Sequence, residues 1–345
     1  MCLNDNRFIL SQIDYNYSGY DETECFNVCY GLDKNFLFGC GVSIASILIN
    51  NPQEKLAFHV FTDYFSTDFR EEFEMLAKKY KTRIFIYLIN GDTLKTLPST
   101  RSWSYAIYFR FIIADYFSDK LDRILYLDAD IVCKGSIQEL IDFNFDPDDI
   151  AAVVAEGDEK WWKRRAEHLS TPGLVDGYFN SGFLLIQPPV WAAQRISSNA
   201  IELLNDQEIT NKITHFDQDV LNILLTGKIK FIDRKFNTQY SINYELKDIT
   251  VNPVRNSTVL VHYIGPTKPW HSWGDYPVSS FFYQAKDASP WQNTKLFEPQ
   301  NTVQSRYAAK EGANKQVISS QADSLIKISR IWADFFPANT SNQPI

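Results

Sequence analysis

Short apolar runs alternate with amphipathic stretches through the first third of the chain. Four runs have the length and composition of buried strands: residues 26–30, 56–61, 83–89 and 124–127. Three stretches between them have the apolar spacing of helices: residues 36–47, 66–80 and 102–117. This alternation predicts an α/β fold in which a mostly parallel central sheet is joined by right-handed helical crossovers.

The same alternation continues further along the chain, without an internal repeat. We predict further strands at residues 151–154, 183–186, 229–232 and 259–262. We predict further helices at residues 136–141, 157–170, 190–204 and 217–225. A chain of 345 residues could form one large domain or two smaller ones. We expect a nucleotide-binding domain over residues 25–275, since the first predicted strand, its glycine-containing turn and the helix after it have the form of a nucleotide-binding βα unit.

The two ends of the chain differ from this central part. Residues 1–24 are mostly polar, and we expect a loosely held leader there. Residues 276–336 are expected to form a small, mainly helical extension, in which apolar positions at 318–335 follow a helical spacing. Such a helix would lie on an anionic membrane or dock against the domain. We expect residues 337–345 to be a disordered tail.

Two carboxylates directly follow the fourth predicted strand. Asp128 and Asp130 flank Ala129, and because an unpaired charge is costly inside a sheet, both belong at the carboxyl end of the strand. Ligands of open α/β sheets bind at that edge. Oxygen ligands suit Mg²⁺ or Mn²⁺, which commonly share their coordination with a substrate phosphate. The alternative is a solvated Asp-x-Asp turn.

Three other segments offer candidate chemistry. The turn at residues 31–35 holds an aspartate and an asparagine that would either contact a nucleotide or only cap the next helix. Arg110 would either contact a phosphate or pair on the far face of its helix. The segment 161–165 combines two tryptophans with basic residues, which favours either an anionic partner or a solvated helix face.

His262 leaves the last predicted strand and enters a loop with a glycine, two prolines and Lys268. A histidine there is either structural or a third metal ligand, since Mn²⁺ accepts mixed nitrogen and oxygen ligands. The loop itself would be rigid and would present polar groups. On the first interpretation the two aspartates act without it, and on the second all three hold one ion.

Composition narrows the possible partners. The chain has 42 acidic and 34 basic residues, a net charge of −8, which argues against general nucleic-acid binding. Its five cysteines show neither a Cys-x-x-Cys pair nor zinc-finger spacing, so we expect reduced thiols in a cytoplasmic protein. We also expect no signal peptide and no membrane-spanning helix.

Six segments in order resemble glycosyltransferase family 8: residues 27–35, 108–110, 127–130, 178–182, 217–219 and 262–271. The resemblance implies the GT-A fold and a retaining, metal-dependent transfer from a UDP-sugar. Residues 31–46, 108–117 and 265–273 resemble enzymes that build the outer core of lipopolysaccharide, above all those that form an α-1,3-galactosyl linkage. The UDP-glucose-dependent α-1,3- and α-1,2-glucosyltransferases of the same core are the alternatives.

The resemblance also implies roles for individual residues. It places Asp128, Asp130 and His262 on the metal, with Ala129 between the two aspartates. The remaining implied contacts with the UDP-sugar come from Gly31, Leu32, Asp33 and Asn35 at the uridine, Arg110, Gly265 and Lys268 at the phosphates and donor, and Asn180, Ser181 and Asp217 at the sugar. Gln218 would lie near the anomeric carbon, so that Gln218 and Asp217 form the catalytic pair.

The implied reaction needs a lipopolysaccharide core acceptor, which is an anionic, lipid-anchored saccharide. We therefore expect a cytoplasmic protein that makes peripheral contact with the inner membrane and binds no nucleic acid. Two interpretations compete: a phosphohydrolase with an Asp-x-Asp metal site, and a non-catalytic sugar-binding protein of the same fold.

Overall fold

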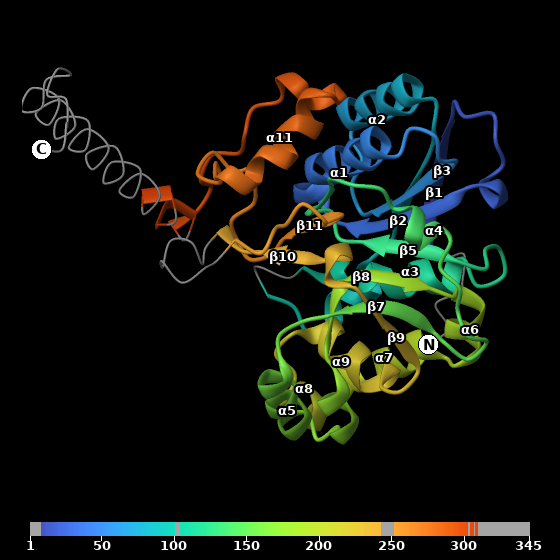
Figure 1. Ribbon diagram of the computed structural model, residues 1–345, viewed down its shortest axis with the longest axis vertical. Coiled ribbons are helices and arrows are strands. Elements are labelled where there is room, and N and C mark those ends of the chain that lie inside the picture. Colours follow the sequence, from blue (N-terminus) through green and yellow to red (C-terminus); the bar gives the residue numbers. More distant parts are fainter. Residues whose placement is uncertain (1–7, 101–103, 243–251, 303, 307, 310–345) are drawn as a thin grey trace, which may run out of the picture.

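A central eight-stranded sheet organises the molecule. The computed structural model describes residues 8–100, 104–242, 252–302, 304–306 and 308–309. The strand order in the sheet is β1-β4-β3-β2-β5-β8-β7-β9 (Figure 1). Its strands are β1 (Ile9–Asn16), β2 (Phe26–Leu32), β3 (Leu56–Thr62), β4 (Arg83–Ile89), β5 (Ile124–Leu127), β7 (Ala151–Ala155), β8 (Phe179–Ile186) and β9 (Ile229–Ile232).

Strand direction changes at β8. The pairs β4/β3, β3/β2 and β2/β5 are parallel, whereas β8 runs antiparallel to both of its neighbours, β5 and β7. The amino end of β8 therefore lies beside the carboxyl ends of β5 and β7. A second sheet of three strands lies next to this edge, in the order β10 (Thr238–Tyr240), β11 (Leu260–Tyr263) and β6 (Ile131–Cys133).

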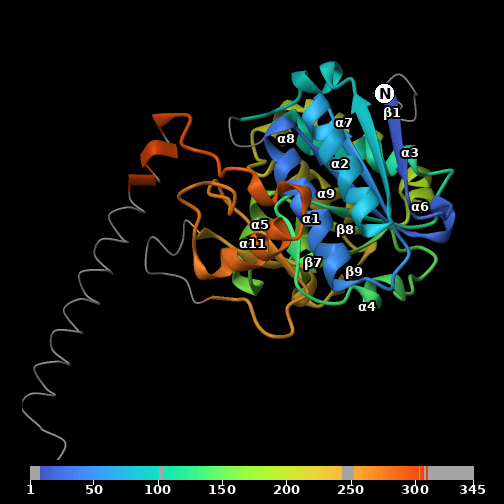
Figure 2. The ribbon, with the colours of Figure 1, turned by 90° about the horizontal axis from the view of Figure 1, so that it is seen from above.

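Helices cover both faces of the large sheet. On one face lie α1 (Leu37–Asn50), α2 (Thr67–Tyr80) and α11 (Ser280–Asp287), side by side in the view from above (Figure 2). Alternate β2 residues, Val28 and Tyr30, enter the core on this face, while Cys29 enters the core on the other. Two hydrophobic cores therefore hold the sheet between them, as expected for a doubly covered α/β sheet.

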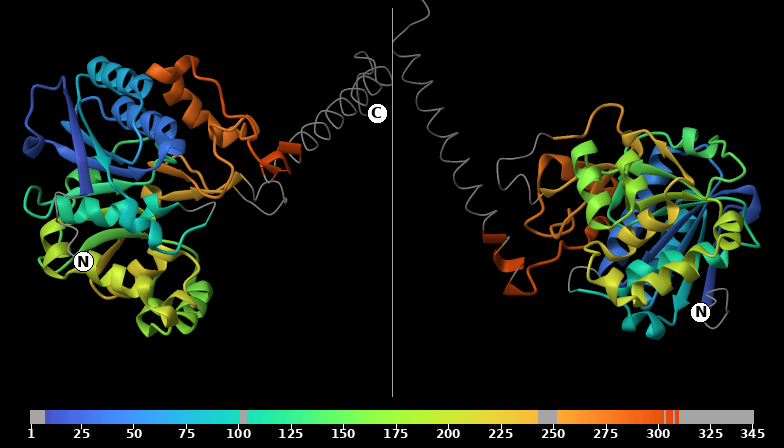
Figure 3. Two further views of the ribbon diagram at one scale, coloured as in Figure 1. Left: turned by 180° about the vertical axis from the view of Figure 1, so that it is seen from behind. Right: turned by 90° about the horizontal axis from the view of Figure 1, so that it is seen from below.

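The opposite face carries α3 (Phe109–Tyr116), α6 (Pro188–Ala193), α7 (Ile196–Asn205) and α9 (Phe216–Leu225). In the view from below, the yellow-green helices of residues 159–225 form this layer (Figure 3). Three further helices are α4 (Gln138–Ile141), α5 (Glu159–His168) and α8 (Gln207–Thr210). Short 3-10 turns occupy Glu22–Glu24, Lys34–Phe36, Asp92–Thr96, Tyr105–Tyr108, Pro172–Asp176, Arg234–Phe236, Pro277–Ser279 and Pro290–Asn293.

Among the differences from the sequence-based expectations, three concern the large sheet and the helices that cover it. The leader expected over residues 1–24 contains β1, which pairs antiparallel with β4 and closes the edge of the sheet. The helix expected at 190–204 is two helices, because Arg195 adopts a left-handed conformation with φ 54° between α6 and α7. Strand β8 begins four residues before the strand predicted at 183–186, so Asn180 and Ser181 belong to the sheet.

The first part of the expected C-terminal extension packs against the sheet helices. Trp291 is 1% exposed, and its indole fills the space that a side chain at Gly41 of α1 would need. Tyr80 of α2 donates a hydrogen bond to the carbonyl of Ala288. The amphipathic helix expected around 316–336 and the tail at 337–345 lie outside the described residues. None of the helices that are described has both the length and the apolarity needed to cross a membrane.

Candidate active site

The candidate site lies where β2, β5 and β7 end and β8 begins. Because β2 and β5 are parallel neighbours, the turn that follows β2 and the Asp-x-Asp turn that follows β5 open on the same edge of the sheet. The backbone N–H of Asp128 donates to the carbonyl of Gly182, which extends the β5/β8 ladder into the turn. Main-chain pairing therefore fixes the first aspartate beside the amino end of β8.

Asp128, Asp130 and His262 converge at this edge. Each offers one ligand atom, and these three atoms lie within 4.8 Å of one another. The histidine comes from β11, which pairs antiparallel with β6, so that His262 is opposite Ile131, directly after the aspartates. Ligands from distant parts of the chain are therefore brought together by the smaller sheet.

Asp130 shows how well this cluster fits a cation. Its Oδ2 accepts a hydrogen bond from Nζ of Lys268 at 2.5 Å. Its Oδ1 is buried, lies 3.2 Å from Nε2 of His262, and has no hydrogen-bond partner among the described residues. An unpartnered buried carboxylate oxygen is costly, and oxygen and imidazole ligands suit Mn²⁺ or Mg²⁺. The donor set therefore fits a divalent cation.

The charge of Asp130 is maintained by its neighbours. Burial raises the pKa of this carboxyl, but neighbouring positive charge, above all the ammonium of Lys268, outweighs burial and lowers the pKa below its usual range. The carboxylate is thus ionised, as a metal ligand must be.

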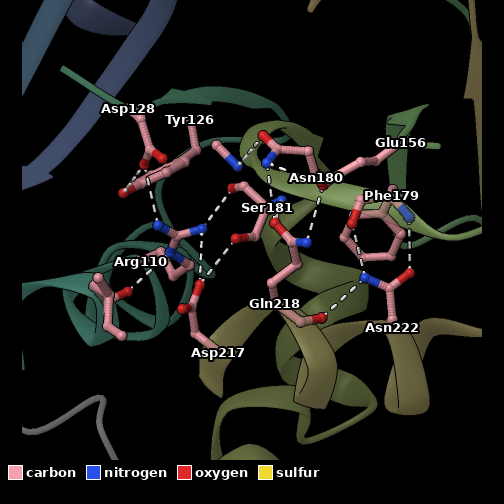
Figure 4. Close-up of polar contacts among 12 residues, drawn as sticks. Arg110, Tyr126, Asp128, Glu156, Phe179, Asn180, Ser181, Asp217, Gln218 and Asn222 are labelled. Atoms are coloured by element: carbon pink, nitrogen blue, oxygen red, sulfur yellow. Dashed lines mark hydrogen bonds and ion pairs between the residues drawn. The ribbon is translucent and has the colours of Figure 1, made fainter. Parts of the chain in front are cut away.

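Arg110 is buried at the centre of the site. Its guanidinium lies 3.0 Å from Asp128 and 3.0 Å from Asp217, and it also donates to the carbonyl of Ser181 (Figure 4). The ring of Tyr126 lies beneath it, 4.7 Å away. Arg110 therefore joins the Asp-x-Asp turn, β8 and α9, and it pairs within the site rather than on the far face of its helix.

The first turn of α9 faces the amino end of β8. Oγ of Ser181 donates to Asp217 at 3.0 Å, and the backbone N–H of Ser181 donates to Oε1 of Gln218 at 3.1 Å. Nε2 of Gln218 donates at 3.0 Å to Glu156, which directly follows β7. Burial raises the pKa of Asp217, although Arg110 acts in the opposite direction. These residues form one polar network (Figure 4).

Asn222 holds α9 against β8. Its Oδ1 accepts from the backbone N–H of Phe179, and its Nδ2 donates to the carbonyl of the same residue. It also donates to the carbonyl of Gln218. The side chain thus acts as a neighbouring strand would, because it satisfies both main-chain groups of one β8 residue.

Gly31 and Leu32 are the last two residues of β2, and Asp33 and Asn35 lie in the turn that follows. Asp33 caps the following 3-10 turn by accepting from the backbone N–H of Asn35 at 2.9 Å. Its second oxygen accepts from Ser104. A side chain at Gly31 would lie 2.8 Å from Cβ of Phe109, so glycine is needed there for close packing.

The loop after β11 returns to the cluster. Gly265 has φ 86°, a conformation that favours glycine. Lys268 is 8% exposed, and besides Asp130 it donates to the carbonyl of Tyr263. Ala129 is buried between the two aspartates. The predicted site residues therefore lie along one edge of the large sheet. One group surrounds Asp128, a second surrounds Gln218, and the remaining residues lie at the end of β2 beside them.

The side chains of the basic segment at 161–165 do not form one exposed, positively charged surface. Arg165 is 8% exposed and forms a buried ion pair with Asp219, which also accepts from Tyr178. Lys163 and Arg164 are exposed. Arg165 therefore belongs to the packing between α5 and α9, and only its two neighbours present charge to solvent.

Two site residues were not predicted from the sequence. Glu156 lies two residues after the strand predicted at 151–154, and a carboxylate close to a strand end is the signal that identified Asp128, so it could have been found in this way. Asn237 is 4% exposed, and its Oδ1 lies 2.9 Å from Nδ1 of His262. Its sequence surroundings carry no such signal, because its place depends on β10 lying next to β11.

Known proteins resemble this chain along most of its length. A lipopolysaccharide 1,3-galactosyltransferase of Salmonella typhimurium strain LT2 is 60% identical over 92% of this chain and 94% of its own. The lipopolysaccharide glucosyltransferase WaaO of Escherichia coli strain K12 is 57% identical over 90% of this chain and 92% of its own. The crystal structure of the galactosyltransferase LgtC with donor and acceptor sugar analogs has a TM-score of 0.64 at 21% identity, and the match covers 76% of this chain and 96% of that one.

These comparisons fix the fold and the family. The likeness to LgtC confirms the GT-A type of α/β fold. The model of the glycosyl transferase family 8 matches residues 27–274, and the model of the family's C-terminal part matches residues 276–325. The expected hexosyltransferase activity is confirmed at this level. From residue 27 to residue 325, this chain belongs to glycosyl transferase family 8.

Proposed function

We propose that this enzyme transfers galactose from UDP-galactose to a hexose of the lipopolysaccharide core and forms an α-1,3 linkage. UDP-glucose is the alternative donor, because a glucosyltransferase of similar identity, 57% against 60%, is among the relatives. The observation that carries the proposal is the convergence of Asp128, Asp130 and His262 beside Lys268 at the sheet edge.

In this proposal the three ligands hold Mg²⁺ or Mn²⁺, which when bound neutralises charge on the diphosphate as the bond to the sugar breaks. Gly31, Leu32, Asp33 and Asn35 bind the uridine. Gly265 and Lys268 bind the diphosphate, where the ammonium adds a second positive centre. Arg110 contacts the donor and orients Asp128 and Asp217.

The sugar lies in this proposal between β8 and α9, against Asn180, Ser181 and Asp217. Gln218 lies near the anomeric carbon, and an amide is a poor nucleophile. We therefore infer that the acceptor attacks from the face on which UDP leaves, and that the leaving phosphate takes the acceptor's proton. A glycosyl adduct trapped on Asp217 or on Glu156, the carboxylate beside Gln218, would overturn this mechanism.

The acceptor is anionic and lipid-anchored, so the enzyme would work at the cytoplasmic face of the inner membrane. The exposed Lys163 and Arg164 are candidates for holding the acceptor. The C-terminal residues beyond 309 are a second candidate from the sequence.

The test is to incubate the protein with UDP-galactose and UDP-glucose separately, with Mn²⁺ and lipopolysaccharide acceptors truncated within the core. We expect Mn²⁺-dependent UDP release with UDP-galactose and an α-1,3 linkage in the product. Asp128→Asn should abolish release, whereas Asp119→Asn, at an exposed ion pair with Lys120, should retain it. Equal release with and without metal, or no release with either donor, would refute the proposal.

A further inference from the structure

The environment of His262 goes beyond its role as a ligand. A neutral imidazole carries one proton, on Nδ1 or on Nε2, and a metal binds only the nitrogen that lacks it. Nε2 of His262 faces Asp130, so it is the nitrogen that must be free. Its Nδ1 faces Oδ1 of Asn237 at 2.9 Å.

The orientation of the Asn237 amide follows from a main-chain group. The backbone N–H of Gly182 can only donate, so the Asn180 atom 3.1 Å away is the oxygen, Oδ1. The Asn237 atom that lies 3.1 Å from the same oxygen is then the donor, Nδ2. The other Asn237 atom, which faces His262, is therefore the oxygen.

We infer that Asn237 is a positioning residue that holds the proton of His262 on Nδ1 and leaves the lone pair of Nε2 aimed at the metal. The inference rests on the proposed function, because it assumes that a cation binds at this cluster. We call the hydrogen bonds that run from the N–H of Gly182 through Asn180 and Asn237 to the imidazole the relay. Each of its three hydrogen bonds has a single possible direction once the first is fixed.

Burial makes this relay effective. Asn237 is 4% exposed and His262 is 3% exposed, so little water can replace the lost partner of Nδ1. A proton on Nε2 would occupy the side of the ring next to Asp130 and would have to leave before a cation could bind. Partners that orient metal-binding histidines typically change metal affinity by about 10–100-fold when they are removed.

The same relay reaches the reaction side of the site. Nδ2 of Asn180 donates to Oε1 of Gln218 at 3.0 Å, and that oxygen also accepts from the backbone N–H of Ser181. Two β8 main-chain donors therefore set the amide orientations of both Asn180 and Gln218. The metal ligand His262 and the residue proposed to lie at the anomeric carbon, Gln218, are therefore connected through Asn237 and Asn180.

The test compares Asn237→Ala with Asn237→Asp, which keeps an oxygen that accepts from Nδ1. The control is Asn51→Ala, at a buried asparagine that binds the main chain of Ile47 and Ile137 in another part of the fold. Mn²⁺ affinity is measured by electron paramagnetic resonance of the free ion, with Mn²⁺ alone and with UDP added. The proton position is measured in the metal-free protein by long-range ¹H–¹⁵N NMR at about pH 8, where an ordinary histidine is neutral.

We expect Nδ1–H for His262 in the wild type and in Asn237→Asp, and a mixture of tautomers in Asn237→Ala. We expect Asn237→Ala to weaken Mn²⁺ binding about 10–100-fold, with substantial rescue in Asn237→Asp and no change in Asn51→Ala. An Nε2–H tautomer in the wild type, or an unchanged Mn²⁺ affinity in Asn237→Ala, would overturn the inference. A wild type that binds no Mn²⁺ in either arm would instead refute the metal site of the proposed function, while the NMR result still decides the proton position.

Discussion

Gly182 allows the sharpest test of the candidate metal site. A Cβ built at this position would lie 2.6 Å from Oδ2 of Asp128, 2.6 Å from Cε1 of His262 and 3.0 Å from Oδ1 of Asn180. Ordinary contacts of such atoms are about 3.5–4.0 Å, so Gly182→Ala must displace at least one of the two ligands by roughly 1 Å. Cation–oxygen distances of about 2.1 Å do not tolerate such a displacement.

The expected result is a loss of Mn²⁺ affinity of about 100-fold or more, since a ligand itself is moved and not only its support. The free energy of unfolding should fall by about 1–3 kcal/mol, the usual cost of overpacking. Mn²⁺ affinity is measured by isothermal titration calorimetry with UDP present, and stability by urea denaturation followed by circular dichroism.

Gly135→Ala is the matched control, because its Cβ would meet no atom closer than 3.5 Å and it lies in the turn after β6. This variant should keep both the affinity and the stability of the wild type. If Gly182→Ala binds Mn²⁺ as tightly as the wild type while it remains folded, the ion does not lie between Asp128 and His262, and the reasoning fails.

Three further predictions test other parts of the structure. Asn222→Ala should lower the free energy of unfolding by about 3 kcal/mol, because it leaves buried groups of Phe179 unpaired; a loss below about 1 kcal/mol in urea denaturation would contradict this. Burial raises the pKa of Asp115 from 3.8 to about 6, so the folded state binds its proton more tightly than the unfolded chain. The free energy of unfolding should therefore fall by up to about 3 kcal/mol as the pH rises from roughly 4 to 6. Asp115→Asn should remove this part of the pH dependence. Parallel curves of unfolding free energy against pH for the wild type and the variant would contradict this prediction. Replacing Lys163 and Arg164 together with alanine should weaken lipopolysaccharide acceptor use more than UDP-sugar hydrolysis, and equal losses in the two assays would exclude them as acceptor contacts.

The central strands could be predicted because their residues are buried on both faces. Residues 56–61 and 83–89 form nearly continuous apolar runs, and the structure has β3 and β4 there. Strand β1 was missed because Ile9–Asn16 mixes polar and apolar residues at the edge of the sheet, where one face stays exposed. The break at Arg195 has no glycine or proline to mark it, since this left-handed residue is an arginine.

The site was predictable where the chemistry belongs to one short segment. The Asp-x-Asp turn is such a segment, and its place at the end of β5 follows from the cost of burying charge. The paired state of Arg165 was not predictable, because its partner Asp219 lies far along the chain and meets it only through the packing of α5 on α9. Asn237 was missed for the same reason.

The reversed direction of β8 has a consequence for how this enzyme can change. The N–H groups of Ser181 and Gly182, which set the direction of the site's amides, are positioned by pairing with β5 and β7. The donor and acceptor directions of the hydrogen bonds at the reacting centre are thus set by strand pairing in the sheet and not by the surrounding loops. The loops can therefore change in sequence to recognise different sugars, while the hydrogen-bond directions of the amide side chains at the end of the sheet are preserved.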